Sequence, residues 1–193
     1  GRVRKKDLPI KESNNFHPAS PYAISKVGTD LVGRFFAEAY SLKVITTRMF
    51  THTGPRRGDV FAESTFAKQI ALIENKKIPP IIKVGNLNSL RTIADVRDAV
   101  RAYHILLTKK PIPGEVYNIG GSSKNSCSIL EAINLIETMT NQKMIYSFKQ
   151  KNRVGDHICY ISDISKLRKH YPNWKIEYSL KEIIRQIISE MKN

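Results

Sequence analysis

The chain has 193 residues, of which 41% are hydrophobic and 25% charged, a composition typical of globular proteins with one sizeable core or two small ones. No apolar run approaches the roughly 18 residues that a membrane-spanning helix requires, and the first residues show no signal-peptide pattern. These features predict no membrane partner.

Basic residues outnumber acidic ones by 32 to 17, which gives a formal net charge of +15. Such an excess is typical of proteins that bind nucleic acid or anionic membranes. Here the basic residues are spread along the chain, with one cluster at residues 2–6, and neither an RNA-binding signature nor a zinc finger is present. We therefore expect no nucleic-acid partner. The same positive charge suits a substrate that carries a pyrophosphate.

The two cysteines, Cys127 and Cys159, do not have the spacing of metal ligands. Two thiols in a chain of this length suggest a reducing compartment, so we expect a cytoplasmic protein. His157 and His170 have no potential ligand partners close in sequence, and no metal site is predicted.

The first predicted element is a loop over residues 1–20, followed by a helix over residues 21–40. Prolines and a polar Ser-Asn-Asn run predict the loop. Ser20 is a suitable N-cap, and Pro21 suits a first helical turn. Apolar residues then recur with the spacing of an amphipathic helix; they include Val27, Leu31, Phe35 and Phe36.

Tyr22 and Lys26 are the candidate catalytic residues of this helix. Residues four positions apart lie on one helix face, so the hydroxyl and the ammonium can reach the same small volume. A nearby cation stabilises a phenolate and moves a tyrosine pKa of about 10 toward neutrality. Such a tyrosine can act as a general acid or base on a hydroxyl or a ketone. The alternative is a surface pair without a function.

Residues 43–50 are β-branched and mostly apolar, which predicts a buried parallel strand. The loop at residues 51–58 follows this strand and contains His52 and Arg57. In open α/β sheets ligands bind beyond the carboxyl ends of the strands, so this loop is a candidate for cofactor or substrate contact. The alternative is an exposed basic turn.

The remaining elements follow from periodicity and turn residues. Asp95 is predicted to cap a helix that ends before Pro111, and Asp163 to cap a short helix. Trp174 is predicted to lie in the core. Helices are further expected over residues 62–77, 128–140 and 179–191, and strands over residues 81–84, 116–119 and 144–148, with a tight glycine turn at residues 120–121.

Residues 16–26 resemble the active-site segment of the extended short-chain dehydrogenase/reductases, which include the nucleotide-sugar epimerases and dehydratases. In that family the tyrosine is the acid/base and the lysine also holds the nicotinamide ribose, which implies these roles for Tyr22 and Lys26. Residues 51–58 resemble the corresponding loop of the GDP-mannose 4,6-dehydratases. The resemblance implies that His52 and Arg57 contact the cofactor, NADP or NAD, although Thr51 stands where those enzymes have Asn.

Two further segments resemble the substrate-binding parts of the family. Residues 85–98 match a segment whose arginine contacts the nucleotide pyrophosphate, which implies substrate binding by Asn86 and Arg91. A guanidinium presents a fork of donors that suits phosphate oxygens. Residues 153–167 match a segment that meets phosphate and ribose, which implies the same for Arg153 and Asp156. Departures from the pattern are Thr92 in place of Asp, Val154 in place of Pro, and Glu63-Ser64-Thr65 in place of Thr-Arg-Lys.

The resemblance implies an α/β fold: the later part of a doubly wound Rossmann domain, interleaved with a small α/β substrate-binding domain. Residues 1–52 and 92–121 are assigned to the first domain, and residues 53–91 and 122–193 to the second. No glycine-rich phosphate loop follows a strand in these residues. We therefore expect the chain to be the C-terminal portion of a longer enzyme.

The implied chemistry is oxidation at C4 of the sugar in a nucleotide-diphosphate sugar, with proton transfer by Tyr22. In a 4,6-dehydratase, loss of water follows. The first hypothesis is a GDP-mannose 4,6-dehydratase. The alternatives are a nucleotide-sugar epimerase similar to CDP-paratose 2-epimerase and a 4-keto-sugar reductase. Relatives also imply a homodimer or homotetramer. A further hypothesis is a protein without catalytic activity, which serves only as a substrate-binding or oligomerising module.

Overall fold

The computed structural model describes residues 3–55, 69, 79, 81–84, 86–87, 89–141, 143, 145–148 and 159–192. Arg57, Arg153 and Asp156 lie outside these ranges, as does the helix predicted over residues 62–77 apart from residue 69. The roles of these residues therefore stay predictions.

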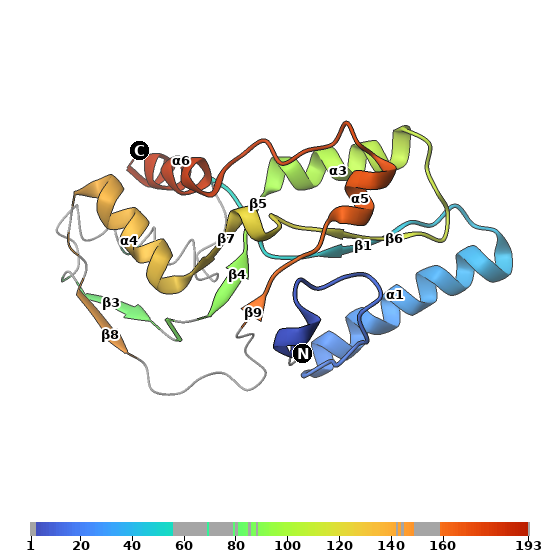
Figure 1. Cartoon of the computed structure of the whole chain (residues 1–193), viewed down its shortest axis with the longest axis horizontal. Coiled ribbons are helices and arrows are strands. Elements are labelled where there is room, and N and C mark those ends of the chain that lie inside the picture. Colours follow the sequence, from blue (N-terminus) through green and yellow to red (C-terminus); the bar gives the residue numbers. More distant parts are fainter. Residues whose placement is uncertain are drawn as a thin grey trace.

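The described elements alternate between helices and short strands (Figure 1). Several predicted elements, among them the helix over residues 21–40, are confirmed to within one residue. The helices are α1 (Pro21–Tyr40), α3 (Val96–Thr108), α4 (Ile129–Thr140), α5 (Ser165–His170) and α6 (Leu180–Lys192), with 3-10 turns at Lys5–Asp7 and Ser123–Asn125. The strands are β1 (Thr46–Met49), β2 (His52–Thr53), β3 (Ile81–Val84), β4 (Leu90–Thr92), β5 (Ala94–Asp95), β6 (Val116–Ile119), β7 (Ser126–Ser128), β8 (Ile145–Phe148) and β9 (Cys159–Tyr160).

One half of the molecule is built on the parallel strands β1 and β6, which pair Thr46 with Val116 and Met49 with Ile119. Figure 1 shows α1 below these strands and α3 and α5 above them. The core of this half lies between β6, α3 and α5, where Trp174 is buried as predicted and its indole N–H donates to the Asp98 carbonyl at 3.2 Å. Helices on both faces of parallel strands are the arrangement of an α/β fold.

The prediction of a buried strand over residues 43–50 was partly wrong. The strand is shorter, Thr46–Met49, and its residues are only half-buried. Its hydrogen-bonded neighbour is β6, and within the described ranges no strand pairs with its other edge. A strand with a hydrogen-bonded neighbour along one edge only keeps part of its surface open, even with helices on both faces.

The apolar face of α1 is also more open than its pattern suggests. Leu31 is 49% exposed and Phe35 55% exposed. The helix instead meets β1 through Gly33, where an added Cβ would lie 3.3 Å from the Thr46 hydroxyl oxygen. Glycine thus lets α1 approach the strand closely, and a row of large apolar side chains is left facing outward.

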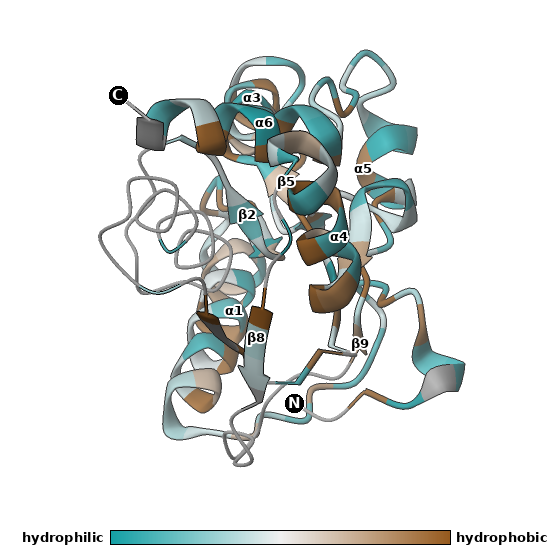
Figure 2. Ribbon diagram, turned by 90° about the vertical axis from the view of Figure 1, so that its left-hand side faces the viewer, coloured by the Kyte–Doolittle hydropathy of each residue, from teal (hydrophilic) through white to brown (hydrophobic). Residues whose placement is uncertain are grey.

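The other half contains the parallel pair β3–β8, the sheet β7–β4–β9, and helices α4 and α6. Two clusters of mainly isoleucine side chains pack α4 and α6 against the strands, and Cys127 is buried among them. In Figure 2 apolar and polar segments alternate along both helices, which is typical of amphipathic helices with one covered face.

Local capping explains where the helices begin. The Ser20 hydroxyl accepts from the Ala23 N–H at 3.1 Å, and Ser128 and Glu131 form a reciprocal capping box. Asp95 caps α3 as predicted. The Asp163 carboxylate accepts from the Ser165 N–H at 2.8 Å, so it caps α5 from one position before the N-cap residue.

The glycine turn after β6 is a point of close packing between the two halves. A Cβ at Gly121 would lie 2.1 Å from the Ile93 carbonyl oxygen, and one at Gly120 would lie 2.5 Å from the Ser162 hydroxyl oxygen. The prediction of a tight turn rather than a phosphate loop agrees with this geometry. Thr92, at the end of β4, is fully buried, and its hydroxyl accepts from the Ser162 N–H at 3.1 Å.

Candidate active site

A broad cleft of about 1260 Å³ lies between the loop that precedes α1, the first turns of α1, and the β1 strand. The loop contributes Phe16 and His17, and α1 contributes Tyr22 and Lys26. Side chains from both halves of the molecule therefore meet at this cleft, because Tyr160 of β9 also lines it.

Tyr22 and Lys26 face the cleft from adjacent turns of α1. The Lys26 ammonium nitrogen lies 5.4 Å from the centroid of the Tyr22 ring. Tyr22 is 72% exposed, so its phenol is accessible to a ligand in the cleft. The Ser20 cap and Pro21 begin the helix immediately before Tyr22, which fixes where the phenol enters the cleft.

An aromatic pair that the sequence did not single out forms another wall of the cleft. Phe50, directly after β1, stacks on Tyr160 with ring centroids 4.4 Å apart and an interplanar angle of 25°. Burial raises the pKa of Tyr160. The rule that ligands bind beyond strand carboxyl ends could have pointed to Phe50, because this residue ends the predicted strand. Nothing in the sequence pairs it with a residue more than a hundred positions later.

His52 lies close to the cleft without lining it. It belongs to β2, which pairs in parallel with β5, and its Nδ1 lies 3.2 Å from the Phe50 carbonyl oxygen. The prediction that His52 follows the carboxyl end of β1 is confirmed, and its contact with a cofactor stays a prediction. His170 lies elsewhere, with Nδ1 2.8 Å from the Tyr117 hydroxyl oxygen.

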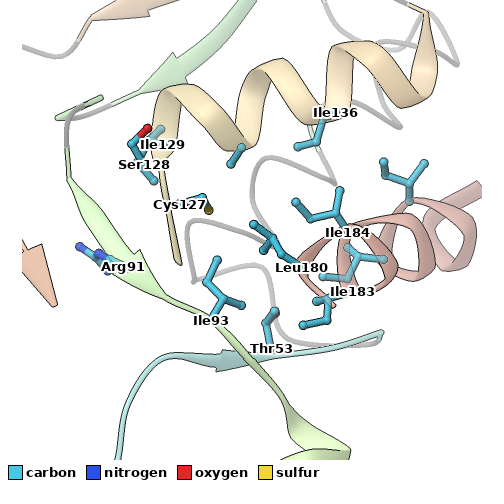
Figure 3. A pocket seen from close by; sticks show the side chains of 13 residues that line it. Thr53, Arg91, Ile93, Cys127, Ser128, Ile129, Ile136, Leu180, Ile183 and Ile184 are labelled. Atoms are coloured by element: carbon cyan, nitrogen blue, oxygen red, sulfur yellow. The ribbon is translucent and has the colours of Figure 1, made fainter. Parts of the chain in front are cut away.

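Arg91 lies on β4, in register with Tyr160 of the neighbouring strand β9. Its Nε donates to the Ser89 hydroxyl at 3.4 Å. Figure 3 shows its side chain directed away from the isoleucine-rich space between α4 and α6. Asn86 is half-buried in the turn before β4. The structure thus places Arg91 on the strand next to β9, whose Tyr160 lines the cleft, whereas Asn86 lies in the turn before β4 and is not among the described residues that line the cleft.

The space between α4 and α6 in Figure 3 is an apolar cavity of about 40 Å³. Its walls are mainly isoleucine side chains of α4 and α6. It is too small for a nucleotide and offers almost no polar partners, so it is a packing void rather than a substrate site.

Within the described ranges, no group of three or more His, Cys, Asp or Glu side chains is arranged to hold a metal ion. In the same part of the chain, no helix combines the length and the apolar character needed to cross a membrane.

The sequence profile of the family described as GDP-mannose 4,6 dehydratase matches residues 1–187. The chain belongs to this family. Its membership confirms the predicted relation to the extended short-chain dehydrogenase/reductases, the nucleotide-sugar dehydratases and epimerases. The α/β fold with a Rossmann-type domain is likewise confirmed, whereas the predicted domain boundaries stay a prediction.

Individual members of the family and related structures resemble the chain over nearly all of its length. The GDP-6-deoxy-D-mannose reductase of Pseudomonas aeruginosa is 27% identical over 100% of this chain and 62% of that protein. The structure of RMD from Pseudomonas aeruginosa complexed with NADPH has a TM-score of 0.89 at 28% identity, covering 100% of this chain and 63% of that one. The UDP-glucuronic acid 4-epimerase from Bacillus cereus, in complex with UDP-glucuronic acid and NAD, has a TM-score of 0.82 at 26% identity, covering 95% and 56%. The chain therefore spans less than two thirds of these relatives.

Proposed function

We propose that the protein is an NAD(P)-dependent enzyme that acts at C4 of the sugar in a nucleotide-diphosphate sugar, with GDP-mannose 4,6-dehydratase as the first candidate. The observation that carries this proposal is the shared orientation of Tyr22 and Lys26, two groups suited to proton transfer, into one open cleft. Family membership supports the same chemistry.

In the proposed reaction Tyr22 is the catalytic acid/base. Its phenol oxygen takes the proton from the C4 hydroxyl during oxidation and returns it during reduction. Lys26, one helical turn away, stabilises the negative charge that develops on that oxygen. The open position of Tyr22 supports the role, because a catalytic group must come within hydrogen-bond reach of the hydroxyl that it deprotonates.

NADP or NAD is the proposed cofactor, since the RMD structure is complexed with NADPH and the epimerase structure with NAD. When bound, the nicotinamide accepts or supplies the hydride at C4. The residues present fit such a group: Lys26 offers a donor for ribose hydroxyls, and the Phe50–Tyr160 stack offers an apolar wall suited to a flat ring. His52 and Arg57 are proposed as further cofactor contacts.

The nucleotide part of the substrate is proposed to bind Asn86, Arg91, Arg153 and Asp156. Two guanidinium groups suit a pyrophosphate, and the net charge of +15 favours an anionic ligand in general. Binding energy from this part would position C4 beside Tyr22, far from the phosphate contacts. The proximity of Arg91 to Tyr160 supports this arrangement.

A 4-keto-sugar reductase is the second candidate, because the GDP-6-deoxy-D-mannose reductase resembles this chain over its whole length. A nucleotide-sugar 4-epimerase is a third.

We also propose a homodimer or homotetramer, and the exposed apolar side chains of α1 support an interface with a second copy. Light scattering of the purified protein tests this, and a monomer at micromolar concentration would contradict it.

Product mass, together with chromatographic retention for the stereoisomer, separates the three reactions. The full-length protein is incubated with GDP-mannose and NADP, with a GDP-4-keto-6-deoxy sugar and NADPH, and with UDP-glucuronic acid and NAD. A dehydratase gives a product lighter by one water, a reductase gives one heavier by two hydrogens with loss of NADPH, and an epimerase gives a stereoisomer of unchanged mass. Conversion of none of them would refute the proposal for these substrates.

The hypothesis of a module without catalytic activity is tested by calorimetric titration of the protein with GDP and with NADPH. Binding of both ligands supports the enzyme. Binding of GDP alone would favour a module that only holds substrate.

A further inference from the structure

An ion pair joins Asp30 of α1, one turn beyond Lys26, to Arg48 of β1. Asp30 is 6% exposed and continues the face of Tyr22 and Lys26 at the i, i+4, i+8 spacing. Its carboxylate accepts from Arg48 of β1, from Nε at 2.7 Å and from Nη2 at 3.2 Å. A bidentate pair of this kind fixes the plane of the guanidinium.

The rest of the Arg48 guanidinium holds the loop that leads into α1. Its Nη1 donates to the Glu12 carbonyl oxygen at 2.7 Å, and its central carbon lies 4.4 Å from the centroid of the Phe16 ring. The Glu12 carboxylate in turn accepts from the backbone N–H of Asn118 at 2.8 Å. One side chain therefore ties the loop to both α1 and the β1–β6 pair.

This loop is a wall of the candidate active site. Phe16 lines the same cleft as Tyr22 and Lys26, and so does Arg48 itself. The guanidinium of Arg48, however, is engaged by Asp30, Glu12 and Phe16, all of them protein groups. Three of the five N–H donors of Arg48 are thus used to hold α1 and the loop.

We propose that Arg48 is a positioning residue that clamps residues 12–16 to α1 and so sets the width of the cleft above Tyr22 and Lys26. Lysine cannot replace it, because a single ammonium cannot bind Asp30 in a fork, reach the Glu12 carbonyl and stack on Phe16 together. The effect on turnover rests on the proposed function, whereas the clamping of the loop does not.

The test compares Arg48→Lys, Arg48→Met and the double variant Asp30→Leu/Arg48→Met in the full-length protein. Arg34→Met is the matched control, because the Arg34 Nε pairs with the same carboxylate at 3.0 Å from within α1, and no hydrogen bond or ion pair between Arg34 and the loop is present in the described ranges. The double variant removes both charges of the Asp30–Arg48 pair. Arg34 also loses Asp30, but its side chain is 32% exposed and keeps access to solvent, so the thermal midpoint is expected to stay close to that of the wild type.

Two readouts are measured on each variant: hydrogen exchange of residues 10–17 by mass spectrometry, and kcat and KM on the sugar substrate that the wild type converts. We expect faster exchange of the loop in all three Arg48 variants, with unchanged exchange in the middle of α1. We expect kcat to fall about a hundredfold in the double variant while KM changes little, since a shift of about 1 Å in an active site can have this effect. Arg34→Met is expected to match the wild type in both.

Wild-type loop exchange in the double variant would overturn the clamp, and wild-type kcat in that stable variant would overturn the positioning role. If the wild type converts no nucleotide sugar, the proposed function fails, and the exchange data still decide whether Arg48 holds the loop.

Discussion

Gly121 offers a quantitative test of how the two halves of the molecule meet. In a Gly121→Ala variant the new Cβ would lie 2.1 Å from the Ile93 carbonyl oxygen and 2.7 Å from the Asn125 Cβ. Real Cβ atoms do not approach other atoms this closely, so backbone on one side must move. Overpacking of this kind costs typically about 1–3 kcal/mol, and contact with a carbonyl rather than a flexible side chain favours the upper end.

The assay is thermal unfolding followed by circular dichroism. A loss of about 3 kcal/mol corresponds to a fall in Tm of roughly 6–12 °C for a chain of this size. Gly28→Ala is the matched control, because no atom of the described residues lies within 4 Å of a Cβ at that position in α1. That variant is expected to gain about 0.5–1 kcal/mol, since alanine favours a helix interior over glycine. Equal Tm values for Gly121→Ala and the wild type would refute the close packing.

Two further predictions concern the packing and charge of the fold. Ile183 of α6 is fully buried. The Ile183→Ala variant is expected to have a free energy of unfolding lower by about 2–5 kcal/mol, measured by urea titration. A loss below about 1 kcal/mol would contradict this prediction. Partial burial raises the pKa of Glu115, but the Lys166 ammonium outweighs it and holds this pKa below its usual value of 4.5. The ion pair with Lys166 therefore stabilises the fold at pH values above the usual Glu pKa of 4.5, and this stabilisation is lost as the pH falls through the lowered pKa of Glu115. Glu115→Gln should be less stable than the wild type at pH 7 and converge with it in acid; a difference independent of pH would exclude this mechanism.

Local signals in the sequence were sufficient for most of the long elements. Ser20 with Pro21 specifies a helix start within a few residues of chain, and the structure begins α1 at this point. The helix predicted over residues 128–140 is likewise present, and the structure adds the capping box of Ser128 and Glu131 at its start. The short strands β2, β4, β5, β7 and β9 were not predicted. Two or three residues are too few for a hydrophobic period, and their pairing depends on contacts between distant segments.

The candidate site was predictable where its residues are neighbours in sequence. Tyr22 and Lys26 lie on one helix, so their spacing alone brings them together. The Phe50–Tyr160 stack and the clamp of Arg48 on Glu12 join segments that only the tertiary fold brings into contact. The spacing of Asp30 and Arg34 is a local signal for their ion pair within α1, but nothing local indicates the pairing of Asp30 with Arg48, because Arg48 lies on the following strand.

The central claim is that the phenol of Tyr22 moves the proton at the sugar C4. The most direct measurement is single-turnover transfer of a deuterium from C4 of the sugar to the cofactor by the full-length wild type and by Tyr22→Phe, which lacks only the hydroxyl, with binding of the nucleotide sugar measured in parallel. The account predicts unchanged binding and a transfer rate reduced by about 10²–10⁴-fold, the usual contribution of a general acid or base. A transfer rate within a few-fold of the wild type, at equal binding, would contradict it.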